Sequence, residues 1–306
     1  MKGPRQFARN IRSRVRVLRA VLAHPIHEGR RAEAAKRWLR LTFADWVAPG
    51  HQVIPYVEGA VLVWRREATS VMICARYGLG EFEDMAFVLH FLRSEDLFCD
   101  VGANAGVYTV LAAKVVGAKV VSAEPVPTTY DLLMQNVYAN GISDRVDALR
   151  CGVGRERGRL HFTATNWSYN RVVDGPGEGV VEVDVLPLDM ILDGRIPRAM
   201  KVDVEGFEAE VVAGAAATLG SPDFQALIIE MSYQVEAYGA RLDAIDGVLK
   251  AHGLLGPFWY DPWSRSLVPP GDLATRKANH IYVRDLDFVA ERLRGARKFN
   301  VHNRLI

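Results

Sequence analysis

The sequence has only three cysteines, Cys74, Cys99 and Cys151, and they stand far apart with no Cys-x-x-Cys pair. This scarcity excludes a disulfide-rich secreted scaffold and a cysteine-based zinc site. Cys99 lies within an apolar stretch and Cys151 follows another, so we interpret both as small buried hydrophobic residues. We therefore expect a cytoplasmic protein from a reducing compartment.

Long apolar runs are also missing. No run approaches the ~20 residues that span a bilayer. The N-terminal stretch does not resemble a secretion signal, because Arg14, Arg16 and Arg19 interrupt its apolar residues. No His-x-x-x-His or similar spacing marks a transition-metal site. The remaining composition, 49% hydrophobic and 24% charged over 306 residues, suits one large globular domain with an appendage.

Acidic residues are scarce at the N-terminus. Residues 1–40 hold twelve Lys and Arg but two Glu, a local charge of +10 in a chain whose net charge is +2. Ile11, Val15 and Leu18 recur at helical spacing between the arginines. Such a basic amphipathic helix could contact an anionic membrane peripherally through residues 1–22; the alternative is a solvated helix whose apolar stripe packs on the domain. Aromatic residues for base stacking are missing there, so we expect no nucleic-acid partner.

The patterns divide the chain into an N-terminal appendage, residues 1–80, and a larger domain, residues 81–306. In the appendage we expect two helices broken at His24-Pro25, then a β-hairpin turning at Glu58-Gly59. Strand and helix patterns alternate in the larger domain, which predicts a doubly wound, mostly parallel α/β sheet. The predicted parallel strands are 97–101, 119–123, 146–149, 200–204 and 226–231. A terminal antiparallel hairpin pairs 258–260 with 280–283, and a last helix starts near 286.

A glycine turn follows the first of these strands, and the second strand ends in Glu124-Pro125. An acid at a strand tip, about 20 residues past a glycine turn, is how α/β folds hold ribose hydroxyls. The glycine spacing is not the G-x-G-x-x-G of dinucleotide folds, which argues against a nicotinamide dehydrogenase. The turn also lacks the Lys-Ser/Thr of phosphate loops. The predicted cofactor-binding residues are Asp100, Gly102, Ala103, Asn104, Gly106, Glu124 and Pro125.

Ionisable residues cluster at the tip of the strand predicted at 200–204. If this strand persists, Lys201, Asp203 and Glu205 share one face of a covered sheet, where charges are costly unless paired or functional. One alternative is a structural Lys201–Asp203 salt bridge. The other is catalytic: Asp203 or Glu205 acts as a general base, or both hold a divalent metal ion. Glu230, at the next strand tip, could join either arrangement or accept hydrogen bonds from a loop.

Three segments in this order resemble the FkbM family of S-adenosylmethionine-dependent methyltransferases. They are Asp100 to Gly106, Ala123 to Pro127, and Lys201 to Glu208 with its K-x-D-x-E-G signature. The resemblance extends over residues 78–284. It implies a Rossmann-like fold, S-adenosylmethionine as cofactor, and commonly O-methylation of sugars, glycans or other small molecules that carry hydroxyls. Ala105 departs from the family, which usually has a larger apolar residue there.

The resemblance does not decide whether the chain is catalytic or which substrate it binds. A non-catalytic nucleoside-binding scaffold of the same fold is the alternative function, and the charged strand tip argues against it. The insertion at 159–185 matches nothing that would identify the substrate. Within it, Trp167, Tyr169 and Asn170 are candidates for contacting a sugar, with loop packing as the alternative.

Overall fold

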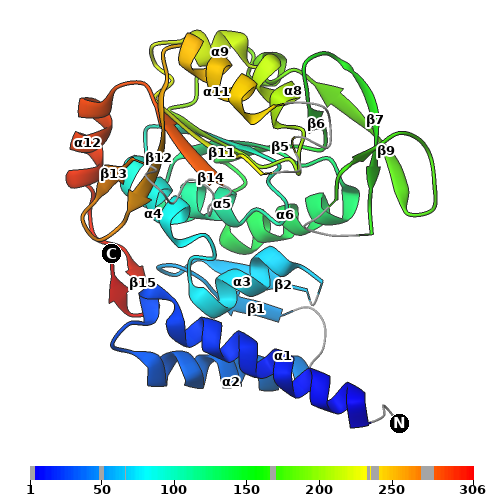
Figure 1. Cartoon of the computed structure of the whole chain (residues 1–306), viewed down its shortest axis with the longest axis vertical. Coiled ribbons are helices and arrows are strands. Elements are labelled where there is room, and N and C mark those ends of the chain that lie inside the picture. The colour runs from blue at the N-terminus through cyan, green and yellow to red at the C-terminus, as the bar shows by residue number, and fades with distance from the viewer. Residues whose placement is uncertain are drawn as a thin grey trace.

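A computed structural model describes residues 4–47, 52–65, 67–165, 170–232, 235, 241–269 and 279–306. Its centre is a sheet flanked by helices (Figure 1). This sheet has eight strands in the order β13-β12-β14-β11-β10-β3-β4-β5. The strands are β3 (Leu97–Val101), β4 (Lys119–Ala123), β5 (Val146–Leu149), β10 (Ala199–Val202), β11 (Ala226–Glu230), β12 (Leu255–Asp261), β13 (Ser266–Val268) and β14 (Asn279–Val283). Strands β11, β10, β3, β4 and β5 run parallel, and β14, β12 and β13 are antiparallel. The doubly wound, mostly parallel sheet is therefore confirmed.

The predicted hairpin at the end of the domain is also formed. Strands β12 and β14 pair antiparallel, and β13 extends this edge of the sheet by one strand that the sequence pattern did not predict. The last helix, α12 (Leu286–Arg294), starts where predicted, with Asp285 as its N-cap.

Several strand ends differ from their predicted positions, and the end of β10 matters for the site. Strand β10 ends at Val202, two residues before its predicted end, so Glu205 does not continue the alternation of the strand. The physical reason is a turn of the backbone: Glu205 and Gly206 have φ values of 54° and 106°. The last hydrogen bond between β10 and β3 runs from the Asp203 N–H to the Val101 carbonyl oxygen. Asp203 thus stands at the strand tip and Glu205 in the turn beyond it.

Helices cover both faces of the sheet, and alternate strand residues enter two separate cores. Phe98 belongs to one core, and Cys99 and Val101 belong to the other, as the period of a buried strand requires. The first face carries α4 (Phe82–Phe91), α5 (Val107–Val110), the π-helical segment η2 (Leu111–Val116), α6 (Pro127–Asn140) and α12. The second carries α7 (Leu188–Leu192), α8 (Glu208–Ala213), α9 (Ala216–Gly220) and α11 (Leu242–Ala251). All three cysteines are free and buried, as expected for Cys99 and Cys151.

The insertion after β5 forms a small sheet of its own, in the order β6-β9-β7-β8. Its strands are β6 (Gly152–Val153), β7 (Gly158–Thr163), β8 (Val172–Val173) and β9 (Val180–Leu186). Phe162 on β7 packs with Val126, next to the main sheet's strand tips. The insertion therefore borders the region where ligands bind in open α/β sheets.

The N-terminal segment lies at one end of the molecule's long axis (Figure 1). It contains α1 (Pro4–Ala23), the 3-10 turn η1 (Pro25–His27), α2 (Arg31–Val47), β1 (Gln52–Pro55), β2 (Val61–Trp64) and α3 (Thr69–Tyr77). The break between the helices and the hairpin are as predicted. Asn136 and Asn140 of α6 accept hydrogen bonds from the Val63 and Val61 N–H groups, at 2.6 and 2.9 Å, which ties the hairpin to the main domain.

The C-terminal hairpin, β15 (Asn300–Val301) with β16 (Arg304–Leu305), reaches back to the same segment. The Arg304 guanidinium donates to the Pro25 carbonyl at 2.6 Å. The boundary at residue 80 stays a prediction, and these contacts show that the segment packs on the larger domain. No helix within the described ranges has the length and apolar character needed to cross a membrane.

Candidate active site

A cleft of about 260 Å³ opens where β3, β4, β10 and β11 end. Ten of the eleven predicted site residues line it: Asp100, Gly102, Ala103, Asn104, Glu124, Pro125, Lys201, Asp203, Glu205 and Glu230. The other, Gly106, begins α5 with a φ of 78°, and a Cβ there would come within 2.4 Å of Leu133 Cδ1. Gly106 therefore permits the close packing of α5 on α6.

The turn after β3 touches the tip of β10 through its backbone. Gly102 has a φ of 79°, and a Cβ at this position would lie 1.8 Å from the Asp203 carbonyl oxygen. The Gly102 and Ala103 N–H groups both donate to the Ala123 carbonyl at 3.0 Å. Only glycine fits between these two strand ends, and the arrangement brings the cofactor turn, Glu124 and Asp203 to one edge of the sheet.

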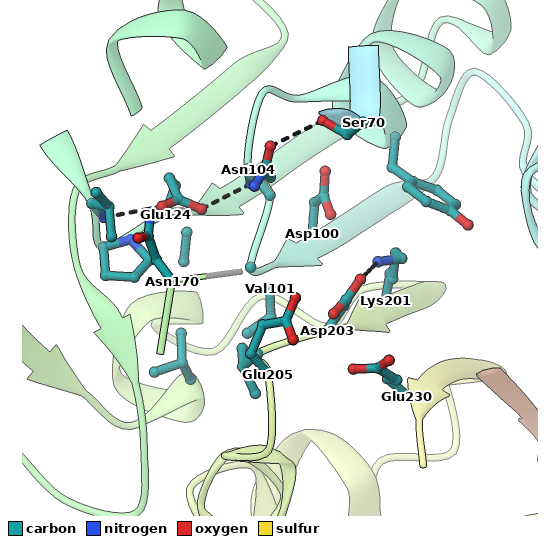
Figure 2. A pocket seen from close by; sticks show the side chains of 18 of the residues that line it. Ser70, Asp100, Val101, Asn104, Glu124, Asn170, Lys201, Asp203, Glu205 and Glu230 are labelled. Atoms are coloured by element: carbon teal, nitrogen blue, oxygen red, sulfur yellow. Dashed lines mark hydrogen bonds and ion pairs between the residues drawn. The ribbon is translucent and has the colours of Figure 1, made fainter. Parts of the chain in front are cut away.

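Glu124 is a buried carboxylate that organises this edge. Its Oε2 accepts from the Asn104 N–H at 2.8 Å, and its Oε1 accepts from the Val126 N–H at 3.0 Å and the Thr129 hydroxyl at 2.5 Å. Burial raises the pKa of Glu124, and these hydrogen bonds oppose the shift. Each carboxylate oxygen can accept two hydrogen bonds, so Oε2 keeps acceptor capacity beside the cleft (Figure 2). This suits a ribose hydroxyl.

Asn104, one of the predicted cofactor-binding residues, caps the turn after β3. Its Oδ1 accepts from the Ala105 N–H at 2.8 Å and from the Ser70 hydroxyl at 3.0 Å (Figure 2). Ser70 belongs to α3, which also contributes Thr69 and Ile73 to the cleft. Sequence reasoning missed these three residues because they precede the recognisable motifs and have no pattern of their own.

Lys201 is buried among opposite charges. Its Nζ lies 2.7 Å from Asp203 Oδ2 and 4.7 Å from the centre of the Tyr108 ring. Burial by itself would lower the pKa of Lys201, but the attraction of Asp203, Glu81 and Asp100 outweighs it and raises that pKa. The salt bridge that the sequence offered as a structural alternative is therefore present. Asp203 still lines the cleft, so the pairing does not by itself assign its role.

Two further acids surround this ion pair. Asp100 is fully buried and accepts a hydrogen bond from the Thr109 hydroxyl at 2.6 Å. Burial raises the pKa of Asp100, and the positive charge of Lys201 opposes that shift. Glu81 accepts from the Tyr108 hydroxyl at 2.5 Å. Glu81 is not among the predicted site residues, and the structure places it in the cleft.

Glu230 is a carboxyl group with a strongly raised pKa. Its Oε2 is buried and has no hydrogen-bond partner among the described residues. Burial raises the pKa of Glu230 to about 8, with further contributions from the negative charges of Asp203, Glu205 and Glu208. Asp203, Glu205 and Glu230 converge at the tips of β10 and β11 (Figure 2). A carboxyl that titrates near neutral pH is suited to proton transfer.

Glu208, the last residue of the family-like segment, supports the turn that carries Glu205. Its Oε1 accepts from the Val204 and Gly206 N–H groups, at 3.1 and 3.2 Å. The side chain is completely buried, and this burial raises the pKa of Glu208 to about 6. These bonds hold the backbone that leaves β10 and so position the acidic cluster.

The structure gives no support to the metal hypothesis for Asp203 and Glu205. In the part of the chain that is described, no three His, Cys, Asp or Glu side chains are arranged to hold an ion. Of the insertion candidates, Asn170 lines the cleft, whereas Trp167 and Tyr169 lie outside the described residues.

A second chamber of about 430 Å³ adjoins the cleft and shares Glu81, Asp203 and Glu230 with it. Its other lining residues are His24, Pro25, Gly80, Phe82, Glu83, Asp84 and Asn279. The Asn279 amide donates to Glu81 and Asp84, at 3.1 and 3.0 Å. Burial lowers the pKa of His24 to about 4, so its imidazole is neutral near pH 7, and the other ionisable side chains that line the chamber are carboxyl groups.

Comparisons with known proteins identify methyltransferases as relatives of this chain. The hexuronic acid methyltransferase AglP of Haloferax volcanii is 30% identical over 164 residues, which cover 51% of this chain and 64% of that protein. The methyltransferase sdnD of Sordaria araneosa is 28% identical over 186 residues, 56% of this chain and 67% of that protein. A TehB-like methyltransferase structure from Corynebacterium glutamicum superposes with a TM-score of 0.41 at 11% identity, over 71% of this chain and 96% of that one. The methyltransferase FkbM domain matches residues 100–254, half of the sequence, and the chain belongs to the FkbM family of methyltransferases.

Proposed function

We propose that this chain transfers the methyl group of S-adenosylmethionine to a hydroxyl of a sugar or a similar polyhydroxyl molecule. The observation that carries the proposal is the position of Asp203 and Glu230, which line both the cofactor cleft and the adjoining chamber. Residues shared by two connected spaces are suited to act where two ligands meet.

The cleft residues suit a nucleoside cofactor without phosphates. S-adenosylmethionine supplies a methyl group on a sulfonium, which a nucleophile displaces. We assign the ribose hydroxyls to Glu124 and the close backbone approach to the turn from Gly102 to Asn104. Asp100 and Pro125 complete the polar and apolar walls on either side of that turn.

We assign the second chamber to the methyl acceptor. Its carboxylates and the Asn279 amide offer the hydrogen-bonding groups that hydroxyls need. The carboxylates of Glu83 and Asp84 disfavour an anionic acceptor. The Haloferax relative is named for hexuronic acid, whereas we expect this chain to prefer a neutral or amino-bearing acceptor.

Among the three acids at the strand tips, we assign the general base to Glu230. Its pKa of about 8 lies near neutrality, and its Oε2 has no competing partner among the described residues. Asp203 is paired with Lys201, and Glu205 adds negative charge that keeps the Glu230 pKa high. An ionised Glu230 would remove the hydroxyl proton as the new oxygen–carbon bond forms.

The test is a transfer assay with S-adenosylmethionine labelled in its methyl group. Matched acceptors, a neutral hexose glycoside, its amino sugar and its uronic acid, are offered separately, and products are identified by mass spectrometry. We expect O-methylation of the neutral or amino sugar and a weak or absent reaction with the uronic acid. Transfer to a nitrogen or carbon acceptor while every hydroxyl acceptor stays unmodified would contradict the proposal, and a preference for the uronic acid would contradict the chamber assignment.

A further inference from the structure

The outer face of α2 carries large apolar side chains that are mostly exposed in the described structure. Leu39, Phe43, Trp46 and Val47 are 57%, 62%, 74% and 59% exposed. Trp46 has the highest exposure of the large hydrophobic residues described, and its ring lies 5.9 Å from that of Phe43. A contiguous exposed patch of this kind marks an interaction surface more often than a scattered residue does. We call these four residues the α2 patch.

The α2 patch is separate from the face that α2 uses for folding. Ala34 is buried, and Trp38 and Leu41 are at least half-buried on the inner side, where α2 packs against α1 and α3. The patch residues recur at intervals of three or four, so they form a second stripe along the opposite side. The inner stripe alone accounts for the packing of the helix, and the outer stripe needs another explanation.

Cations surround the α2 patch. Lys36 and Arg40 are exposed on the same stripe, one turn from Leu39 and Phe43. Arg14, Arg16 and Arg19 are exposed on the neighbouring helix α1. Residues 1–47 hold twelve Lys and Arg against three Asp and Glu, a charge of +9, while the whole chain carries +2. Aromatic rings set among basic residues match the two layers of an anionic bilayer surface, headgroups and upper acyl chains.

Helices α1 and α2 lie together at the end of the molecule away from the main sheet (Figure 1). Val21 is buried, and Leu18 and Leu22 are partly buried, so the apolar stripe of α1 is largely used in packing over this half of the helix. The sequence had suggested membrane contact through residues 1–22. The structure moves the apolar contribution to α2 and leaves α1 a mainly electrostatic one.

We propose that the α2 patch, with Lys36, Arg40 and the arginines of α1, docks this protein on an anionic lipid bilayer. Phe43 and Trp46 would enter the interface, and the cations would attract the lipid headgroups. Pro25 and His24, which connect the two helices, also line the second chamber. One short segment therefore joins the docking surface to the proposed acceptor site.

The test is co-sedimentation of the full chain with vesicles of phosphatidylcholine, with and without phosphatidylglycerol. We expect binding to the anionic vesicles that weakens steeply with added salt. Phe43→Ser with Trp46→Ser should reduce the partition coefficient about tenfold or more, and Lys36→Glu or Arg40→Glu about fivefold or more each. Tyr138→Ser is the matched control, because Tyr138 is an aromatic residue that is 66% exposed on α6, and it should bind as the wild type does.

Three results would overturn the proposal. The first is equal sedimentation of the wild type and the Phe43/Trp46 double variant at every salt concentration. The second is a dimer of the wild type that this double variant converts to a monomer, which would assign the α2 patch to a second copy of the chain. The third is nucleic-acid binding that the charge reversals abolish and the aromatic changes leave intact. Unchanged cofactor affinity and melting temperature in all variants confirm that the fold is preserved, so the outcome does not depend on the methyl-transfer proposal.

Discussion

Lys201 Nζ lies 2.7 Å from Asp203 Oδ2, and the two residues stand two positions apart at the end of β10. Lys201 is buried, whereas the Asp203 side chain retains 27% exposure. The buried charge of Lys201 is therefore stable only because neighbouring carboxylates compensate it. The pair links the stability of the strand tip to the chemistry of the cleft.

Asp203→Asn should therefore lower the free energy of unfolding by about 1–3 kcal/mol, below the 3–5 kcal/mol typical of a fully buried pair because Asp203 is partly exposed. Asp100 and Glu81 continue to compensate Lys201. The double variant Lys201→Met with Asp203→Asn should regain part of this loss, as urea denaturation can measure. Equal stability of Asp203→Asn and the wild type would show that the pair contributes nothing to the fold.

The general base is tested by three conservative variants, Glu230→Gln, Asp203→Asn and Glu205→Gln. Loss of a general base should lower turnover by about 10²–10⁴-fold while the affinity for S-adenosylmethionine stays nearly constant. We expect that result for Glu230→Gln and smaller effects for the other two. Wild-type turnover should also rise with pH through about 8, where Glu230 loses its proton, and Glu230→Gln should lose this rise.

A chelator provides the control for the metal hypothesis in the same assay. Turnover that falls on chelation and recovers with added divalent cation would favour metal ligation by Asp203 and Glu205 over base catalysis by Glu230. Full turnover by a stable, cofactor-binding Glu230→Gln variant would remove Glu230 from the mechanism.

The raised pKa of Glu230 also makes the stability of the protein depend on pH. The folded state holds this proton up to about pH 8, whereas the unfolded chain releases it near the ordinary value of 4.5. Between these values the folded state binds more protons, so stability falls as pH rises through the window. Glu230→Gln should reduce this decrease of stability with pH, which can be measured from urea unfolding midpoints across the same pH window. An identical slope in the two proteins would contradict the burial argument.

Glu124→Ala should weaken S-adenosylmethionine binding by about 1–3 kcal/mol, because the ribose hydroxyls lose a buried acceptor. The exposed Glu156 provides the matched control, and Glu156→Ala should leave affinity unchanged. Titration calorimetry and melting temperature are measured on the same samples, since Glu124 also accepts from Asn104, Val126 and Thr129. Binding of NAD by the wild type, or indifference of a folded Glu124→Ala variant, would refute the cofactor assignment.

Two glycine substitutions should have effects of opposite sign. Gly102→Ala places a Cβ 1.8 Å from the Asp203 carbonyl and should destabilise the fold by more than about 2 kcal/mol. Gly247 stands exposed within α11 with open space around it, so Gly247→Ala should stabilise by up to about 1 kcal/mol. Thermal denaturation measures both effects. An unchanged melting temperature for Gly102→Ala would mean that the turn and β10 are less tightly packed than described.

The sequence by itself predicted the parallel sheet and ten of the residues that line the candidate cleft. Strands β3, β4 and β5 have the predicted bounds because short apolar runs between turn signals encode them locally. Glu124 and Asp203 were identifiable because parallel strands bring their carboxyl ends to one edge, whatever the details of packing. The motif residues therefore needed no tertiary information to be found.

Only the tertiary structure decided which of those charges are paired and which are not. The ion pair of Lys201 with Asp203 is seen only in the folded structure. The high pKa of Glu230 depends on burial and on three carboxylates of the segment that follows β10. Ser70 and Glu81 reach the cleft because α3 and α4 pack beside it, a long-range contact that no local pattern encodes. The same holds for α2, whose sequence is apolar on two sides. Packing against α1 and α3 buried one side and left Phe43 and Trp46 on the other.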